Sequence, residues 1–393
     1  MSCRNLETSR RTVAVSVTLL GAALCAVMMA YMVFGDNNDE EGLRTLRMIS
    51  IIFRHGNRTP TDFYPNDPYL LYDWPGGQGA LTETGALQMY NLGKTLRMRY
   101  YRLLPTNGLY SKDEMHILSS AAERCLMSAS SLLAGFLPPL ESRNILPIPW
   151  QPVPVNLIPR DRDFLLAQKK PCPTYDEILG KLYSNPPPDL KKLNEKSAEL
   201  YRFLTKNTGK NISNIREVEL LFNTLAIEQD AGLTLPAWTE SVFPDKMLPL
   251  AERNYVLHTE TSLMKKIKGG PLITTIYRNM TRKRGKKLQP DRKVFLYSAH
   301  DVTLVNVMNS LGILDQTAAR PDYASALVFE MHHSNYYKDD FEVKIVYYFN
   351  SEDKFPKELR IPNCDSPCSL TNFGRSIEHL LVDDYDEICG AIS

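Results

Sequence analysis

Residues 48–60 read MISIIFRHGNRTP and hold the most informative pattern in this chain of 393 residues. The first six residues are a short apolar run, which predicts a buried β-strand over 48–53. Arg54, His55 and Arg58 follow directly at the end of that strand. Guanidinium groups suit phosphate oxygens, and an imidazole nitrogen can attack phosphorus. The stretch therefore predicts a site for a phosphoryl group at the end of a strand.

Two later segments also place polar residues after an apolar run. Residues 115–118 predict a strand, and Arg124 lies in the first turn of the helix that the following sequence predicts. Residues 293–297 predict another strand, and His300 and Asp301 lie between it and a second helical pattern. Open α/β sheets bind ligands at the carboxyl ends of their strands, beside helix N-termini that favour anions. We therefore expect the three groups of residues to meet in one crevice.

The heptapeptide at 54–60 resembles the R-H-G-x-R-x-P signature of the histidine acid phosphatases. This branch of the histidine phosphatase superfamily includes prostatic, lysosomal and insect venom acid phosphatases. Three further segments are similar to stretches of that family, namely SSAAER at 119–124, WQPVPV at 150–155 and YSAHD at 297–301. The resemblance runs from about Leu43 to the C-terminus.

The resemblance implies a role for each residue of the predicted crevice. His55 is expected to attack phosphorus and form a phosphohistidine, which water then hydrolyses. Asp301 is expected to give a proton to the leaving oxygen and later to accept one from water, while His300 stabilises the phosphoryl group. The residues expected to bind the phosphate oxygens are Arg54, Arg58 and Arg124.

Two positions depart from the family pattern. Asn57 stands where the family usually has Asp, and Cys125 stands where Thr is usual. Neither change removes a group that performs the expected chemistry. The first alters local charge and the second alters packing beside the phosphate, so we expect them to affect substrate preference.

The predicted chemistry needs neither a metal nor another cofactor. His332 and His333 are adjacent, and neighbouring side chains on a strand point to opposite faces. Cys364 and Cys368 lack the second matching pair that a structural metal site needs. We therefore expect no metal ligands among these four residues.

The sequence thus predicts an acid phosphatase that hydrolyses phosphate monoesters. One alternative is a narrow-specificity phosphatase for a sugar, inositol or lysolipid phosphate. Another is a catalytically weak surface protein that binds phosphorylated ligands. The presence of all six expected site residues argues against this last alternative.

The order of strand and helix patterns predicts an α/β fold with a mixed, mostly parallel sheet flanked by helices. The segment at about 170–284 lacks a strand-like run and contains helical patterns at 190–205 and 215–227. We expect it to form an inserted, mainly helical cap within a phosphatase domain at 44–393. Residues 343–349 are rich in Val, Ile, Tyr and Phe and predict a late strand.

The N-terminal region predicts an uncleaved signal anchor. Residues 12–34 carry no charge and are long enough to span a bilayer, for which about 20 residues suffice. Three arginines precede this run, so we expect a cytosolic tail at 1–11, a stalk at 35–43 and the domain outside the cytosol. A long, cleaved signal peptide is the alternative and would give a secreted or lysosomal protein.

The cysteines fit a domain of the secretory pathway. Cys125 is the expected buried free thiol. By sequence alone, Cys172, Cys364, Cys368 and Cys389 can form disulfides in three ways. The resemblance favours pairing Cys172 with Cys389 and Cys364 with Cys368.

The sequence contains three sequons, of which the one at Asn57 lies inside the motif at 54–60 and is expected to be unmodified. Asn211 and Asn279 begin N-glycosylation sequons, as expected of a chain that meets the secretory machinery. The net charge of +1 gives no electrostatic indication of nucleic-acid binding, and we expect the basic cluster at 282–287 to be a solvated face. Phosphate monoesters and the membrane are the expected partners, and the sequence leaves a homodimer open.

Overall fold

The computed structural model describes residues 43–390. The chain separates into one unit at 1–46 and another at 47–393, and the fold described below is that of the second unit. The tail and anchor predicted at 1–11 and 12–34, and most of the stalk, lie outside the described residues. Among the residues that are described, no helix is both long and apolar enough to cross a bilayer.

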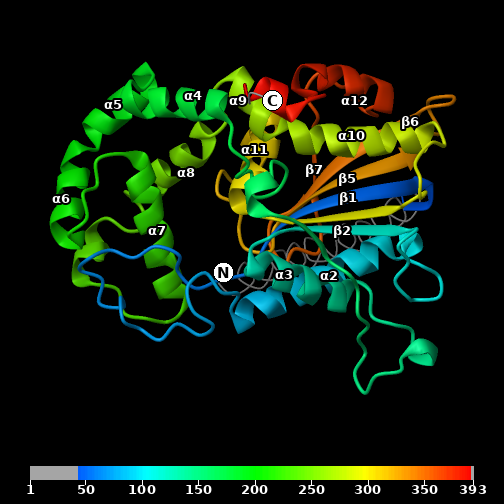
Figure 1. Cartoon of the computed structure of the whole chain (residues 1–393), viewed down its shortest axis with the longest axis horizontal. Coiled ribbons are helices and arrows are strands. Elements are labelled where there is room, and N and C mark those ends of the chain that lie inside the picture. The colour runs from blue at the N-terminus through cyan, green and yellow to red at the C-terminus, as the bar shows by residue number, and fades with distance from the viewer. Residues whose placement is uncertain (1–42, 391–393) are drawn as a thin grey trace, which may run out of the picture. The chain divides into compact units, whose positions relative to one another are not determined.

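A seven-stranded sheet with the order β3-β2-β4-β1-β5-β6-β7 forms the centre of this unit (Figure 1). β4 is parallel to β1 and to β2, and β2 is parallel to β3, whereas β6 is antiparallel to β5 and to β7. The predicted α/β class with a mixed sheet is confirmed. The strands are β1 (Leu46–Arg54), β2 (Met115–Ser120), β3 (Asn156–Ile158), β4 (Val294–Ala299), β5 (Ala326–His333), β6 (Phe341–Tyr348) and β7 (Lys357–Leu359).

The apolar run that predicted the first strand forms the buried centre of the sheet. In β1 every residue from Met48 to Arg54 is buried, as is usual for a parallel strand covered on both faces. Arg54 pairs with Ala299 at the end of β4, and Ser119 of β2 pairs with Ser298 of the same strand. The carboxyl ends of these three neighbouring strands therefore lie at one edge of the sheet.

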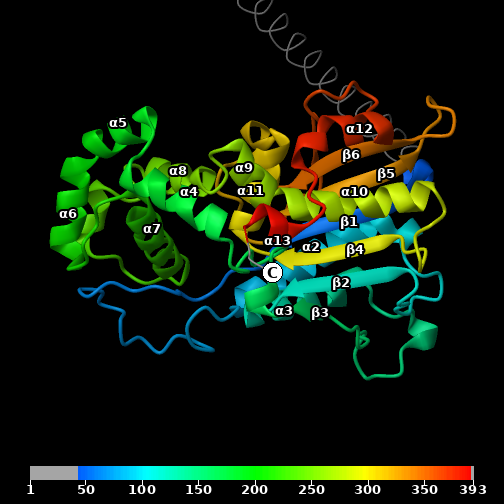
Figure 2. The same cartoon turned by 45° about the horizontal axis from the view of Figure 1, so that its top comes forward.

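Helices cover both faces of the sheet (Figures 1 and 2). α2 (Glu83–Tyr100) and α3 (Glu123–Phe136) pack against each other on one face. α10 (Gly270–Arg284), α11 (Asp301–Leu311) and α12 (Leu370–Ser376) cover the other face.

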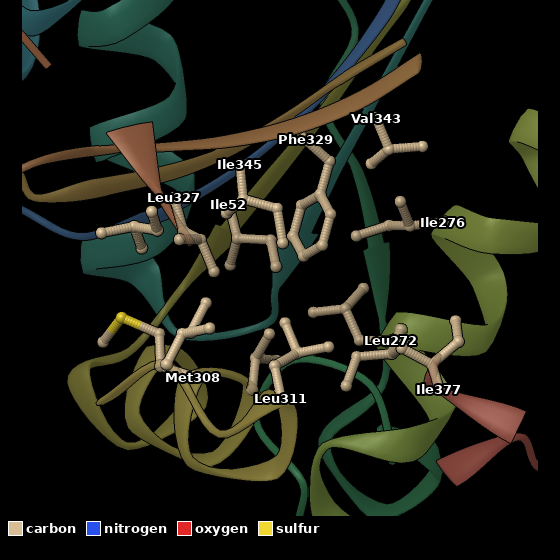
Figure 3. Packing of buried hydrophobic residues seen from close by; sticks show 14 of the residues in the cluster. Ile52, Leu272, Ile276, Met308, Leu311, Leu327, Phe329, Val343, Ile345 and Ile377 are labelled. Carbon is tan, nitrogen blue, oxygen red and sulfur yellow. The ribbon is translucent and has the colours of Figure 1, made fainter. Parts of the chain in front are cut away.

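The main core lies between the sheet and this second group of helices. Figure 3 shows Ile52, Phe329 and Ile345 of the sheet facing Leu272 and Met308 of the helices. Burying a side chain of this size contributes about 1.5–3 kcal/mol to folding. This packing fixes α11, whose first residue is Asp301, against the end of β4.

A helical region lies beyond the carboxyl ends of β2 and β4 in both views (Figures 1 and 2). It has a hydrophobic core of its own, which includes Leu204, Val218 and Leu257. The helical pattern expected at 190–205 forms two helices, because the chain turns at Ser197 between α5 and α6. The helices between β3 and α10 are α4 (Pro173–Ser184), α5 (Pro188–Lys196), α6 (Ala198–Thr208), α7 (Ile215–Asp230), α8 (Leu248–Leu257) and α9 (Ser262–Lys268). The last helix of the chain is α13 (Tyr385–Ile388).

One of the two disulfides ties the C-terminal segment to the start of α4, and the other closes a short loop within that segment. Cys172 pairs with Cys389 across a Cα–Cα distance of 4.7 Å, and Cys364 pairs with Cys368 across 5.3 Å. This is the pairing that the resemblance favours. Cys125 is a free, buried thiol.

The two sequon asparagines expected to be glycosylated differ in their surroundings. Asn211 is exposed between α6 and α7. Asn279 is half-buried within α10, and its side chain hydrogen-bonds Tyr297 in the core. Glycosylation of both residues stays a prediction, and the geometry favours Asn211.

Candidate active site

The expected site residues lie together at the carboxyl ends of three neighbouring strands. β1 ends at Arg54 and is followed by His55, α3 after β2 carries Arg124 in its first turn, and β4 is followed by His300 and Asp301. The ring centroids of His55 and His300 are 5.7 Å apart. Nη2 of Arg124 lies 3.5 Å from Nδ1 of His300. The sheet register thus brings residues from distant parts of the sequence into one cluster.

His55 is held as a neutral imidazole with one free nitrogen. Its Nδ1 lies 2.8 Å from the carbonyl oxygen of Gly56. A carbonyl only accepts, so Nδ1 carries the proton and the lone pair lies on Nε2. Burial lowers the pKa of His55 well below its ordinary value, and the charges of Arg124 and Arg54 lower it further. The ring therefore keeps a nucleophilic nitrogen in acid.

The loop that carries His55 packs backbone against backbone on the start of α2. A Cβ atom at Gly56 would lie 2.2 Å from the carbonyl oxygen of Gly85, and one at Gly85 would lie 2.1 Å from that of Asn57. The Thr82 hydroxyl accepts from the Gly85 N–H at 3.0 Å and lies 2.9 Å from Oδ1 of Asn57, to which it can donate. Both glycines are needed for this close approach.

We expect Gly85→Ala to displace the His55 loop. Its methyl group would overlap the carbonyl of Asn57, so the free energy of unfolding should fall by about 1–3 kcal/mol and kcat by roughly 100-fold. The matched control is Gly180→Ala in α4, where an added Cβ meets nothing within 4 Å. Helix propensity alone should stabilise that variant by up to about 1 kcal/mol. Thermal unfolding and kcat should be measured on both variants. Equal stability and equal kcat in Gly85→Ala and Gly180→Ala would contradict the steric argument.

Arg54 is fixed from three sides. Its Nη2 lies 2.9 Å from Oδ2 of Asp301, and its Nη1 donates to the carbonyl of Pro321 at 2.7 Å. The guanidinium also lies 4.0 Å from the ring centroid of Tyr323. The side chain of Arg54 is only 1% exposed, so these contacts leave it little freedom.

The charges at the site favour an anion. Burial alone would raise the pKa of Asp301, but Arg54, with His55 and Arg58, outweighs burial and holds that pKa well below its usual range. Three guanidiniums, including that of Arg124, thus face one carboxylate. Among the residues that are described, Nε of Arg124 is buried without a hydrogen-bond partner. A phosphate dianion would offset the excess positive charge and accept such donors.

His300 is also neutral and oriented by its neighbours. Its Nε2 lies 2.9 Å from Oγ of Ser120. Burial, and then the charge of Arg124, lower the pKa of His300 to about 3. Cys125 places its sulfur 3.8 Å from Nε2 of the same ring, and burial raises the pKa of that thiol to about 12. The departure at Cys125 therefore places a neutral thiol against His300.

The departure at Asn57 has a distinct contact. Its Nδ2 lies 3.4 Å from Oδ2 of Asp230, the last residue of α7. An ionised Asp at this position would have no proton to donate and would repel Asp230. The Asn therefore allows a contact between the His55 loop and the helical region.

Metal ligation has no support among residues 43–390, where no group of three or more His, Cys, Asp and Glu side chains is arranged to hold an ion. Nε2 of His332 lies 3.0 Å from Oε2 of Glu330. His333, the next residue of β5, is exposed. Independence from metals stays a prediction.

Comparison with known proteins decides the family. The family model described as the histidine phosphatase superfamily (branch 2) matches residues 45–348, which is more than half of the chain. The chain belongs to this branch of the histidine phosphatases. The resemblance inferred from the strand-end motifs is thus confirmed.

Relatives of this histidine phosphatase include named acid phosphatases. It is 32% identical over 352 residues to lysosomal acid phosphatase of Rattus norvegicus, covering 88% of this chain and 80% of that protein. It is also 32% identical over 351 residues to venom acid phosphatase Acph-1 of Apis mellifera, covering 88% and 87%. The phytase from Citrobacter braakii has the same fold, with a TM-score of 0.65, 18% identity and coverage of 89% of this chain and 100% of that one.

Three contacts of this histidine phosphatase site were not predicted from the sequence. Ser120 lies within a segment noted for its arginine, yet nothing in the sequence marks it as the partner of His300. Tyr323, which stacks on Arg54, lies in the turn before β5, where no site residue was expected. Tyr255 belongs to α8 and reaches Asp301 only because the helical region packs against the strand ends.

Proposed function

We propose that this protein is an acid phosphatase that hydrolyses phosphate monoesters through a phosphohistidine formed on His55. The observation that carries the proposal is a buried, neutral imidazole whose Nε2 is free and which lies among Arg54, Arg58 and Arg124. Nucleophilic attack needs that free lone pair, and the arginines offset the charge that builds on the phosphoryl oxygens.

In the first step Nε2 of His55 attacks phosphorus in line with the leaving oxygen. The P–N bond forms as the P–O ester bond breaks, and the leaving oxygen takes a proton from Asp301. In the free protein Asp301 is ionised because Arg54 and its neighbours hold its pKa low. A bound phosphate dianion competes for those same guanidiniums and adds negative charge nearby. Both effects raise the pKa of Asp301 and favour the proton that it must give.

In the second step water attacks the phosphohistidine. Asp301, now ionised, accepts a proton from that water, and the P–N bond breaks to release inorganic phosphate. His300 supports both steps as a neutral ring that orients Arg124 and Ser120 beside the phosphoryl group. Its proton lies on Nε2 when Arg124 donates to Nδ1, and Ser120 is then its acceptor.

The test is release of phosphate from an aryl phosphate by the purified domain at about pH 5, with a chelator present. We expect turnover that the chelator leaves unchanged, because every proposed step uses side chains of this chain. Loss of activity on chelation would refute independence from metals. Tight binding of phosphate without turnover would support the phospho-ligand binder instead.

The same proposal extends to the cellular compartment. The two disulfides and the lysosomal and venom relatives indicate the secretory pathway. We propose an anchor at 12–34, a catalytic domain at 44–393 on the lumenal or extracellular side, and a helical cap at about 170–284. Protease protection of the full chain in sealed microsomes would test this orientation.

A further inference from the structure

A cavity of about 100 Å³ adjoins Asp301 and contains a second carboxyl group that the steps above do not use. Arg58 and Asp301 line the cavity on the side of the strand ends, and Tyr255 and Glu219 line it from the helical region. Since Asp301 serves the leaving oxygen, this cavity lies where the leaving group would depart. Glu219 therefore faces the acid of the proposed mechanism.

The side chain of Tyr255 lies beside both carboxyl groups. Tyr255 is 2% exposed, and its Oη lies 3.3 Å from Oδ2 of Asp301, to which it donates. The same side chain lies near enough to Glu219 to lower the pKa of that carboxyl group. Asn223 reinforces the arrangement, because its Nδ2 donates to Oε1 of Glu219 and lies 3.5 Å from Oη of Tyr255. On the other oxygen, Nδ2 of Asn254 lies 3.4 Å from Oε2 of Glu219.

The two carboxyl groups differ in protonation. Burial, and next the negative charge of Asp301, raise the pKa of Glu219 to about 7, although Tyr255, Asn223 and Arg58 oppose this rise. In acid Glu219 is therefore a carboxylic acid, while Asp301 is a carboxylate. Two carboxyl groups whose environments push their pKa values apart are suited to different steps of proton transfer.

The other ionisable groups around Glu219 leave it as the proton source. Asp62 also lines the cavity, but it pairs with Lys210 at 2.8 Å. Burial, with a smaller effect from Glu219, raises the pKa of Tyr183 of α4, so this phenol holds its proton. Glu219 is thus the group that has a proton to give in acid, and Tyr255, which donates to Asp301, lies beside it.

Building on the function proposed above, we propose that Glu219 is the proton reserve for Asp301 and that Tyr255 carries the proton between them. When substrate binds, the carboxyl proton of Glu219 passes to Oη of Tyr255 and the hydroxyl proton of Tyr255 passes to Asp301. Asp301 then protonates the leaving oxygen as the P–O bond breaks. In the second step, the proton taken from water returns along the same path, so each group ends as it began.

This reserve matters most for substrates whose leaving group is a poor one. An alkoxide must be protonated as it leaves, whereas an acidic phenol can leave as its anion. Glu219 acts in its protonated form, so its contribution is present below its pKa of about 7 and is lost as the pH rises through that value. The proposal therefore assigns this site to alkyl phosphate monoesters in acid.

The experiment compares glycerol phosphate with p-nitrophenyl phosphate in Glu219→Gln and Tyr255→Phe. We expect kcat for the alkyl ester to fall at least about 10-fold more than kcat for the aryl ester in both variants. For wild type, alkyl turnover should decline above about pH 7, and that decline should be absent from Glu219→Gln. Glu217→Gln is the matched control, since Glu217 lies on the same helix and pairs with Lys210 at 3.2 Å. It should leave the ratio of the two rates as in wild type.

The outcomes separate this inference from the proposed function. An equal fall on both esters would show that Glu219 serves only packing, and no fall on either would show that Asp301 obtains its proton elsewhere. Tyr255→Phe removes a single oxygen and provides the same test if Glu219→Gln does not fold. Wild-type protein that hydrolyses neither ester would overturn the proposed function itself.

Discussion

His55→Ala should lower kcat for phosphate monoesters by at least about 10⁴-fold, the largest effect that we expect from any single substitution in this protein. In the proposed mechanism Nε2 of His55 forms the covalent bond to phosphorus, and the nearest other imidazole among the described site residues is that of His300. The ring of His300 lies 5.7 Å away between centroids and its Nε2 is engaged by Ser120. The arginines would still bind phosphate, so the variant should retain ligand binding while losing turnover.

The measurement has two parts. Rapid quenching of the wild type with labelled aryl phosphate should trap a phosphoenzyme that is labile in acid and stable in alkali, as expected of phosphohistidine. The variant should trap none. His379→Ala is the control, because His379 is an exposed histidine of the C-terminal segment and is not one of the site residues. Trapping of label in His55→Ala would assign the nucleophile to another residue.

The site residues at the strand ends could be predicted because each follows a sequence pattern of only a few consecutive residues. Each of β1, β2 and β4 is a short apolar run followed by a polar turn, and the polar residues that follow include Arg54, His55 and His300. Parallel strands that end at the same edge bring such residues together whatever their distance in sequence. The sheet register then explains why one crevice could be predicted without knowing the strand order.

The side of the site formed by the helical region could not be predicted. Tyr255 and Glu219 lie on amphipathic helices, where a single polar residue on a partly buried face has no distinctive pattern. Their roles depend on how α7 and α8 pack against α11, which is a matter of tertiary contact. Tyr323 was missed for a related reason, since it lies in a loop and is positioned by its stacking on Arg54.

Helix boundaries show the same limit on a smaller scale. The pattern at 190–205 has apolar residues at helical spacing on both sides of the polar residues NEKS at 194–197, and the chain ends α5 at Lys196 and begins α6 at Ala198. Ser197, between them, is compatible with a helix interior as well as with a turn. Both short helices contribute to the core that contains Leu204, with Leu190 from α5 and Tyr201 from α6.

Asp301→Asn should give the largest difference of any variant between the loss of kcat on alkyl esters and the loss of kcat on aryl esters. Without its acid, the protein should lose about 10²–10⁴-fold in kcat on an alkyl ester. An aryl phosphate needs little help to leave, so phosphoenzyme should still form. Its hydrolysis should slow, because no carboxylate accepts the proton of the attacking water. A burst of one phenol per site followed by slow turnover, measured by stopped flow, is the expected signature, and equal losses on both esters without a burst would exclude Asp301 from proton transfer.

The same variant tests the electrostatic argument through binding. Oδ2 of Asp301 lies 2.9 Å from Nη2 of Arg54, so the carboxylate and a phosphate dianion compete for one guanidinium. Asn keeps an oxygen that can accept from Arg54 but removes the charge. Inorganic phosphate should therefore inhibit Asp301→Asn more strongly than wild type, by about 10-fold if one close charge repulsion is removed. Weaker inhibition would mean that Asp301 helps to hold phosphate, and the low pKa of Asp301 would then reflect only its pairing with Arg54.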